Sequence, residues 1–271
     1  MTRGQGGQAG QGGQGGHVTA VMEEYLRAIL DLGMAGRPVI GRRLADWLAV
    51  APSTVTATLQ RMVDQGLVSM SERKEVILSK EGAALAIAAA RRHHLSERLL
   101  TDYMKFDWAR AHGEAERWQH TLTEETEKLL WEALGRPTTC PHGNPIPGTG
   151  ACFSPGTRWL RDAREGDEMV VERIAERAEA DVALMQFFAR QGIVPDAPLQ
   201  IDELVLANGT ISVTTERGPL ALGLEAASQV LVRPKESMPL RQFQVRWQDS
   251  RAAVDTSVPA AVSAAGADGP D

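Results

Sequence analysis

Three side chains that can ligate a metal ion recur at intervals of four residues near the middle of the chain. They are His112, Glu116 and His120. Residues four apart on an α-helix lie on one face with Cβ atoms roughly 5–6 Å apart, so this spacing would gather the three donors into one stripe. His93 and Glu97 repeat the spacing one helix earlier. Imidazole and carboxylate groups at helical intervals predict a metal site built on helices.

The composition excludes several classes of protein. The chain has 271 residues with 43% hydrophobic and 24% charged residues, which is ordinary for a globular protein of two or three domains. A net charge of −6 means that nucleic acid could be bound only through a local basic patch. Two cysteines, Cys140 and Cys152, are too few for a disulfide scaffold or a cysteine-rich zinc site. Without a signal pattern or an apolar run of roughly 18 residues, we expect a cytoplasmic protein with no membrane partner.

Both ends of the chain are predicted to lie outside the folded domains. Residues 1–17 are mostly Gly and Gln, and residues 235–271 form a polar extension followed by a tail rich in Ala, Asp, Gly, Pro, Ser and Val. Such segments have little apolar surface to bury, which predicts flexible tails.

The first predicted domain, residues 18–82, has the pattern of a winged helix-turn-helix. Helical apolar spacing covers residues 21–32, 39–50 and 53–65, and two short extended runs follow at 67–70 and 75–78. Three helices followed by a hairpin are typical of this fold, in which the second helix of the turn-joined pair enters the DNA major groove.

The predicted recognition helix carries short hydroxylic side chains, and basic residues surround it. Such hydroxyl groups permit close approach to base edges, while Arg and Lys can contact phosphate. The alternative is that the hydroxyl groups only cap the helix and that the basic residues form a solvated face. The candidate DNA-binding residues are Arg42, Arg43, Ser53, Thr54, Thr56, Thr58, Arg61, Arg73 and Lys74.

The second predicted domain, residues 83–152, is helical. Helices are expected over residues 80–106, from 107 to about 122, and over 123–134, followed by a loop rich in Pro and Gly at 138–150. Its abundant Leu, Ala and Trp residues suit a dimer interface. A two-fold dimer is what a helix-turn-helix protein needs to contact two half-sites.

The third predicted domain, residues 165–234, changes to short extended runs. Five strands are expected at residues 169–174, 198–206, 210–214, 219–222 and 229–232, with a helix at 180–191 between the first two. This pattern predicts a small SH3-like β-barrel. The whole chain is therefore expected to be mainly α, with a winged helix-turn-helix, a helical dimerisation domain and this barrel.

Five motifs in a fixed order resemble the diphtheria-toxin-repressor family, which includes manganese- and iron-dependent regulators. They are the segment Glu23–Ile29, the recognition helix, the segment Arg92–Leu100, the His112–His120 stripe and the sequence Pro141–Pro147. The resemblance implies a homodimeric transcriptional regulator that binds double-stranded operator DNA when a divalent metal is bound, and that controls metal homeostasis genes. It also implies that the third domain is the FeoA-like, SH3-like domain of that family.

Two metal sites follow from the resemblance, position by position. A primary site would use Glu24, Glu116, Gln119 and His120. An ancillary site would use His93, Glu97 and His112, with a ligand from the third domain near Asp181. The remaining histidines, His17, His94 and His142, are expected to have no ligand role, and the cysteines are expected to be loop thiols.

The donor types favour Mn(II) as the cofactor, with Fe(II) as the alternative. Iron-dependent members of the family have Met and Cys where this chain has Glu24 and Glu116, and oxygen donors suit Mn(II) better than softer metals. Gln119 stands where the family usually has Glu. Arg27 stands where small manganese regulators have a bridging carboxylate, which argues against their closely spaced dinuclear site.

Three functions remain open from the sequence. The first is the metal-dependent regulator, in a manganese or an iron form. The second is a helical metalloenzyme, because His/Glu stripes also build hydrolase and di-iron sites, although no further acid–base or nucleophile set is present. The third is a winged-helix regulator that responds to another signal. We expect a regulator and not an enzyme.

Overall fold

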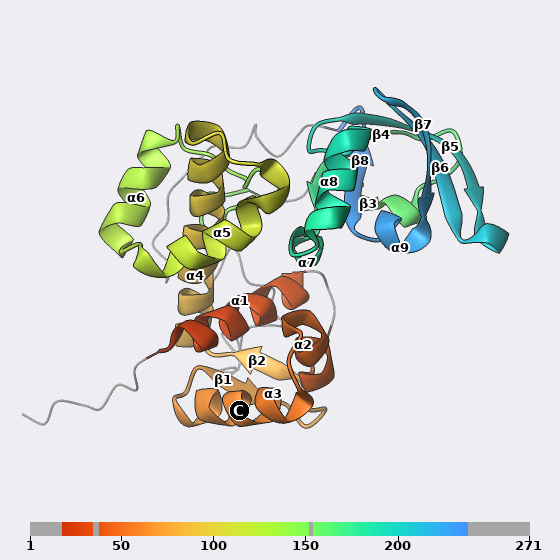
Figure 1. Cartoon of the computed structure of the whole chain (residues 1–271). Coiled ribbons are helices and arrows are strands. Elements are labelled where there is room, and N and C mark those ends of the chain that lie inside the picture. The colour runs from red at the N-terminus through yellow and green to blue at the C-terminus, as the bar shows by residue number, and fades with distance from the viewer. Residues whose placement is uncertain (1–17, 35–37, 152–153, 238–271) are drawn as a thin grey trace, which may run out of the picture.

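The structure, a computed structural model of the full chain, describes residues 18–34, 38–151 and 154–237 (Figure 1). The predicted flexible tails lie outside these ranges, except for residues 235–237 of the polar extension. The chain has three successive parts: a winged helix, a helical part and a part built on a β-sheet. Among the described residues, no helix is both long and apolar enough to cross a membrane.

The N-terminal part has the predicted winged-helix arrangement. Helices α1 (Ala20–Met34), α2 (Gly41–Leu48) and α3 (Pro52–Asp64) precede strands β1 (Val68–Met70) and β2 (Val76–Leu78), which pair antiparallel. Pro52 begins α3 at a position where its missing N–H costs nothing. The core of this part also includes the first turns of α4, so the winged helix is packed directly on the helical part.

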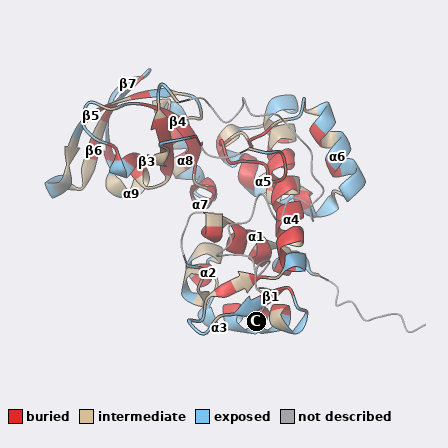
Figure 2. Cartoon of the chain, turned by 180° about the vertical axis from the view of Figure 1, so that it is seen from behind, coloured by how far each residue is buried: buried red, intermediate tan, exposed pale blue. Residues whose placement is uncertain are grey.

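The helical part is arranged around α4 (Lys80–Arg98), which is buried along most of its length (Figure 2). Ser79 caps its first turn by accepting the Gly82 N–H. The predicted helix to residue 106 is wrong beyond Arg98, because the chain continues as a π-helical segment, η1 (Leu99–Tyr103). Such segments change the direction of the side chains that follow.

The helix that carries the His112 stripe is shorter than predicted. A 3₁₀ turn, η2 (Trp108–Arg110), leads into α5 (Ala111–Trp118), and a second 3₁₀ turn, η3 (Gln119–Thr121), follows it. His120 therefore lies on a 3₁₀ turn and not on the α-helix. Helix α6 (Glu124–Ala133) begins at a Thr123 capping box, and Trp131 packs it against α4.

The C-terminal part is an antiparallel sheet with its own core. Its strands are β3 (Arg158–Trp159), β4 (Glu168–Ile174), β5 (Pro198–Val205), β6 (Thr210–Thr215), β7 (Gly218–Gly223) and β8 (Val230–Pro234). Short helices α7 (Glu176–Glu179), α8 (Val182–Gln191) and α9 (Leu224–Ala227) and the 3₁₀ turns η4 (Leu160–Asp162) and η5 (Leu206–Asn208) connect them.

The predicted SH3-like β-barrel is present as a β-sheet domain, but the sheet does not close into a barrel. The strand order is β3-β8-β4-β5-β6-β7, so β3 and β7 are edges and do not pair with each other. The sheet bends at register shifts in β4, between Val171 and Arg173, and in β5, between Ile201 and Glu203. Five of the six strands are predicted by alternation, and β3 is too short for that pattern.

A tight turn fastens the loop after α6 to the C-terminal sheet. The His142 carbonyl accepts the Ile174 N–H from the end of β4 at 2.9 Å. Gly143 follows with φ +91°, and a Cβ there would collide with the Glu172 carbonyl oxygen. Only glycine suits both the backbone conformation and the close approach.

Gly143→Ala should therefore destabilise the protein by about 2 kcal/mol or more, through the left-handed φ and the collision with β4. Thermal unfolding of the purified chain measures the effect. Gly113→Ala is the matched control, because its Cβ would meet nothing within 4 Å on α5. The control should raise stability by up to ~1 kcal/mol. Equal stability of Gly143→Ala and the wild type would contradict this view of the turn.

Candidate metal centre

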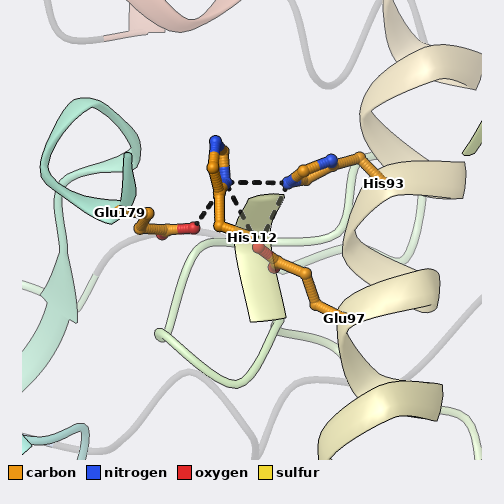
Figure 3. Close-up of side chains that lie close together, drawn as sticks. All are labelled: His93, Glu97, His112 and Glu179. Carbon is orange, nitrogen blue, oxygen red and sulfur yellow. Dashed lines mark hydrogen bonds and ion pairs between the residues drawn. The ribbon is translucent and has the colours of Figure 1, made fainter. Parts of the chain in front are cut away.

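Four buried side chains from three parts of the chain converge where α4, α5 and α7 meet (Figure 3). His93 Nε2 lies 3.1 Å from Glu97 Oε1 and 3.0 Å from His112 Nδ1. His112 Nδ1 lies 3.1 Å from Glu179 Oε2. One donor atom from each of the four lies within 4.8 Å of the others. The structure thus brings together the predicted trio His93, Glu97 and His112.

The C-terminal part contributes different residues from the one predicted. Asp181 does not belong to this cluster, because it is exposed and caps α8 by accepting the Leu184 N–H at 3.0 Å. Glu179, two residues earlier on α7, takes that place. Glu176, also on α7, lies 3.7 Å from His93 Nε2 and 3.2 Å from His94 Nε2.

Two residues without a predicted role lie on the other side of Glu97. Cys140 and His142 are both fully buried, and with Glu97 they form a second group whose donor atoms lie within 4.8 Å of one another. Burial, together with the charges of Glu97 and Glu179, raises the pKa of the Cys140 thiol. The sequence signal was a Cys-x-His pair in a loop, which alone is too short to indicate a site.

The rest of the predicted stripe lies nearer to solvent and faces α1. His120 Nδ1 lies 2.7 Å from Glu23 Oε2, and Glu116 Oε1 lies 3.5 Å from His112 Nε2. Glu24 is close enough to Glu116 that partial burial and this second carboxylate raise its pKa. Both carboxylates at the start of α1 therefore belong to this region, whereas the sequence predicts only Glu24.

Arg27 lies between the buried and the exposed groups. Its buried guanidinium donates to Glu116 Oε1 at 3.1 Å and to Gln119 Oε1 at 3.2 Å. Gln119 is also buried, and its Nε2 lies 3.3 Å from His120 Nε2. A fixed positive charge thus stands between the two predicted ligand sets, as expected for a chain without a closely spaced dinuclear site.

The protonation states of this region suit metal ligands. Burial and the Arg27 charge lower the pKa of His93 to about 4, so its imidazole is neutral at pH 7. The hydrogen bond from His112 lowers the pKa of Glu116 to about 2. Burial opposes protonation of His112, but its bonds to Glu116, Glu179 and Glu97 raise its pKa well above the usual range. A cation bound here would displace the His112 proton.

Unused acceptor atoms indicate that the buried cluster fits a cation. Glu97 Oε2 and Glu176 Oε1 are buried and have no hydrogen-bond partner among the described residues. An unpaired buried carboxylate oxygen is costly unless a positive charge or a donor compensates it. The nitrogen and oxygen donors of the cluster are those that divalent first-row metals bind.

The candidate DNA surface is exposed on α3 and on the hairpin turn. Ser53, Thr54, Thr56 and Arg61 project from α3, and Arg42, Arg73 and Lys74 are exposed nearby, whereas Arg43 is half-buried and donates to the Pro38 carbonyl. The prediction for Thr58 is wrong, because this residue is buried and its hydroxyl accepts a hydrogen bond from Arg61.

Replacing Arg27 tests whether its charge opposes the cation. Arg27→Met should raise the affinity for Mn(II) by about tenfold, because a repelling charge beside Glu116 is lost. It should also lower the stability of the metal-free protein by about 1–3 kcal/mol, because Gln119 Oε1 and Glu116 lose a buried donor. Calorimetric titration and thermal unfolding measure the two effects.

Arg117→Met is the control for this variant, because Arg117 is an exposed arginine on α5 whose partner Glu114 lies outside the cluster. It should change neither quantity. Unaltered or weaker Mn(II) binding by Arg27→Met would show that the guanidinium does not compete with the metal.

A winged helix whose first helix faces imidazole and carboxylate groups, next to a buried cluster of the same groups, is the arrangement expected of a metal-dependent transcriptional regulator. Models of three protein families match successive parts of the chain. Residues 17–76 match "Iron dependent repressor, N-terminal DNA binding domain", residues 79–148 match "Iron dependent repressor, metal binding and dimerisation domain", and residues 159–234 match "FeoA domain".

Individual relatives lead to the same class. The iron-dependent repressor IdeR of Mycobacterium tuberculosis is 36% identical over 190 residues, which are 66% of this chain and 83% of that protein. The diphtheria toxin repressor of Corynebacterium efficiens is 44% identical over 46% of this chain and 55% of its own length. The chain belongs to the diphtheria-toxin-repressor family of metal-dependent transcriptional regulators, and it is not an enzyme.

Solved structures agree with this assignment. A manganese-dependent transcriptional repressor in complex with manganese has a TM-score of 0.70 and 30% identity, and the match covers 79% of this chain and 99% of that one. The manganese regulator SloR has the same fold, with a TM-score of 0.67 at 22% identity over 79% of this chain and 98% of its own. The family therefore contains both iron and manganese regulators.

Proposed function

We propose that this chain is a cytoplasmic homodimer that binds double-stranded operator DNA when Mn(II) is bound, and so controls metal homeostasis genes. The observation that carries the proposal is the approach of α1 to the α5 stripe, where His120 lies 2.7 Å from Glu23 and Glu116 lies beside Glu24. A cation held there would connect the winged helix to the helical part.

We assign the primary site to Glu24, Glu116, Gln119 and His120, with Glu23 as a further carboxylate within reach. The ancillary site would be the buried cluster of His93, Glu97 and His112, completed by Glu179 and Glu176 in place of Asp181. The first site joins residues 18–82 to 83–152, and the second joins 83–152 to the domain at 165–234. Each proposed site therefore lies at a boundary between domains.

The proposed control of DNA binding is thermodynamic linkage. Glu23 and Glu24 are on the helix that packs against α2, the first helix of the DNA-binding pair, and against α4. In the ligand-bound arrangement, α1 is fixed against α5, and this fixes the orientation of α3. A ligand that favours this arrangement shifts the population toward it and raises operator affinity by the same free energy.

The preference for Mn(II) over Fe(II) rests on the donor atoms. Carboxylates at positions 24 and 116 offer hard oxygen ligands, where softer donors would favour other metals. The structural relative that carries 30% identity is described as manganese-dependent. The mycobacterial relatives at 36% identity are described as iron-dependent, so an iron-selective regulator is the second candidate.

In the DNA complex, we assign base contacts to Ser53, Thr54 and Thr56, which are exposed on α3. Arg61 and the hairpin residues Arg73 and Lys74 would contact phosphates, as would Arg42. Two copies of α3 in a two-fold dimer would contact two half-sites of an operator. A net charge of −6 on the chain makes this local basic surface the part that DNA would approach.

Removing the primary ligands tests the proposed function. The double variant Glu116→Ala and His120→Ala should lose Mn(II)-stimulated binding to a DNA fragment selected by the wild-type protein, while it remains folded and dimeric. Fluorescence anisotropy in Mn(II) and in chelator measures binding, and light scattering measures the dimer. Glu114→Gln is the matched control on the same helix and should bind as the wild type does. DNA binding that is insensitive both to chelator and to the double variant would refute a metal-dependent regulator.

The metal preference can be reversed by changing donor atoms. Mn(II) should promote DNA binding by the wild type at a lower free concentration than Fe(II), both measured anaerobically. The variant Glu24→Met with Glu116→Cys should respond to Fe(II) at a lower concentration than to Mn(II), because thioether and thiolate are softer ligands. A wild type that responds to Zn(II) alone would overturn the choice of metal. An unchanged order of metals in the variant would show that these two positions do not set the preference.

A further inference from the structure

Cys140, His142 and Glu97 form a third group of potential ligands that the two proposed sites do not use in full. All three residues are at most 1% exposed, and their donor atoms lie within 4.8 Å of one another. Glu97 comes from α4, while the other two come from the turn that follows residue 139 and is fastened to β4. Sulfur, nitrogen and oxygen donors thus meet at a junction of three segments.

The imidazole of His142 is oriented as a ligand. Its Nε2 lies 3.0 Å from the Trp108 carbonyl oxygen, which can only accept, so Nε2 carries the proton. In the neutral ring, the lone pair is therefore on Nδ1. That atom is buried and forms ion pairs with Glu179 Oε2 at 3.0 Å and with Glu97 Oε1 at 3.5 Å, in which a bound cation would replace its proton. A carbonyl that accepts the other ring N–H is the usual support of a metal-bound histidine.

The thiol is oriented by the same turn. The His142 backbone N–H donates to Cys140 Sγ at 3.3 Å, a bond that stabilises negative charge on sulfur. The turn is closed by hydrogen bonds from Gly143 N–H to the Cys140 carbonyl and from Cys140 N–H to the Asn144 carbonyl, at 3.0 Å and 2.8 Å. Sγ and Nδ1 are therefore held together before any ligand arrives.

The two carboxylates near Cys140 and His142 have oxygen atoms that could bind a cation. Glu97 Oε2 has no hydrogen-bond partner among the described residues. Asn144 Nδ2 donates to Glu179 Oε1 at 2.5 Å, which leaves Glu179 Oε2 facing His112 and His142. Burial opposes protonation of His142, but the nearby charges of Glu179 and Glu97 raise its pKa well above the usual range, so a divalent cation bound here would displace the His142 proton.

We propose that Cys140 Sγ, His142 Nδ1 and Glu97 bind a thiophilic divalent cation of the Zn(II) class, with Glu179 available as the fourth ligand. Tetrahedral sites with Cys, His and carboxylate ligands are characteristic of Zn(II), whereas the Mn(II) sites proposed above contain no sulfur. Cys140 Sγ and His142 Nδ1 each lose a proton to solvent on binding, and no electron is transferred. This cation would fasten the turn after α6 to α4 and, through Glu179, to α7. The inference goes beyond the proposed function and does not depend on DNA binding. Because this cation would use Glu97 and Glu179, it would take the place of a cation in the ancillary site.

Co(II) in place of Zn(II) is the probe, because a thiolate bound to tetrahedral Co(II) gives a charge-transfer band in the near ultraviolet and strong visible bands. The full-length protein, first stripped of metal with chelator, should develop these bands at one equivalent of Co(II) per chain and lose them on addition of Zn(II). Cys140→Ser should lose the charge-transfer band, and His142→Gln should lower the Co(II) affinity by at least about tenfold.

Cys152→Ser is the matched control, because it removes the other cysteine of the chain and should leave the bands unchanged. Glu116→Ala should also retain them, so that failure of the primary site and failure of this one can be told apart. Absence of a thiolate band in the wild type, or its loss in Cys152→Ser, would overturn the proposal. A thiolate band in both the wild type and Cys152→Ser can only come from Cys140. The test therefore remains decisive even if Cys140→Ser does not fold.

Discussion

The central interaction of this structure is the enclosure of one carboxylate by imidazoles. Glu97 is fully buried, and its Oε1 lies 3.1 Å from His93, 3.4 Å from His112 and 3.5 Å from His142. A buried charge persists only if its surroundings compensate it, and removal of such a partner typically costs about 3–5 kcal/mol. The three imidazoles come from α4, α5 and the turn after α6, so a single carboxylate requires three segments to be in place at once.

The donors around it are divided between two environments. Those on α4 and α7 are buried, whereas Glu116 and His120 reach solvent beside α1. Arg27 separates the two sets and pairs with Glu116. Ions in the buried set would exchange slowly, because ligands must move before a cation can enter. The exposed set is free to equilibrate with the medium, and it is also the set that faces the winged helix.

Sequence periodicity predicts the part of the site that lies on regular helices. The four-residue spacing places His93 beside Glu97 and His112 beside Glu116, because one turn of helix fixes those distances. It fails for His120, where α5 tightens into a 3₁₀ turn, and for Thr58, which faces inward at the same spacing as its exposed neighbours.

Residues brought in by the tertiary fold are not predictable in this way. Glu179 and His142 reach the cluster because β4 docks against the turn at Gly143, a contact with no local pattern. The prediction of a barrel fails for the same reason, because closure of a sheet depends on tertiary contacts. Alternation identifies strands but does not determine whether the first and last of them pair, and β3 and β7 do not.

The position of α7 has a consequence for the order in which the protein is completed during synthesis. His93, Glu97 and His112 leave the ribosome well before Glu176 and Glu179, and N-terminal domains generally fold first. A nascent chain that ends before α7 therefore holds His93, Glu97 and His112 without the two carboxylates that α7 adds to them. The buried cluster becomes complete only when the C-terminal sheet has been made and has docked, so a truncated product would retain the winged helix and the helical part but lack the finished centre.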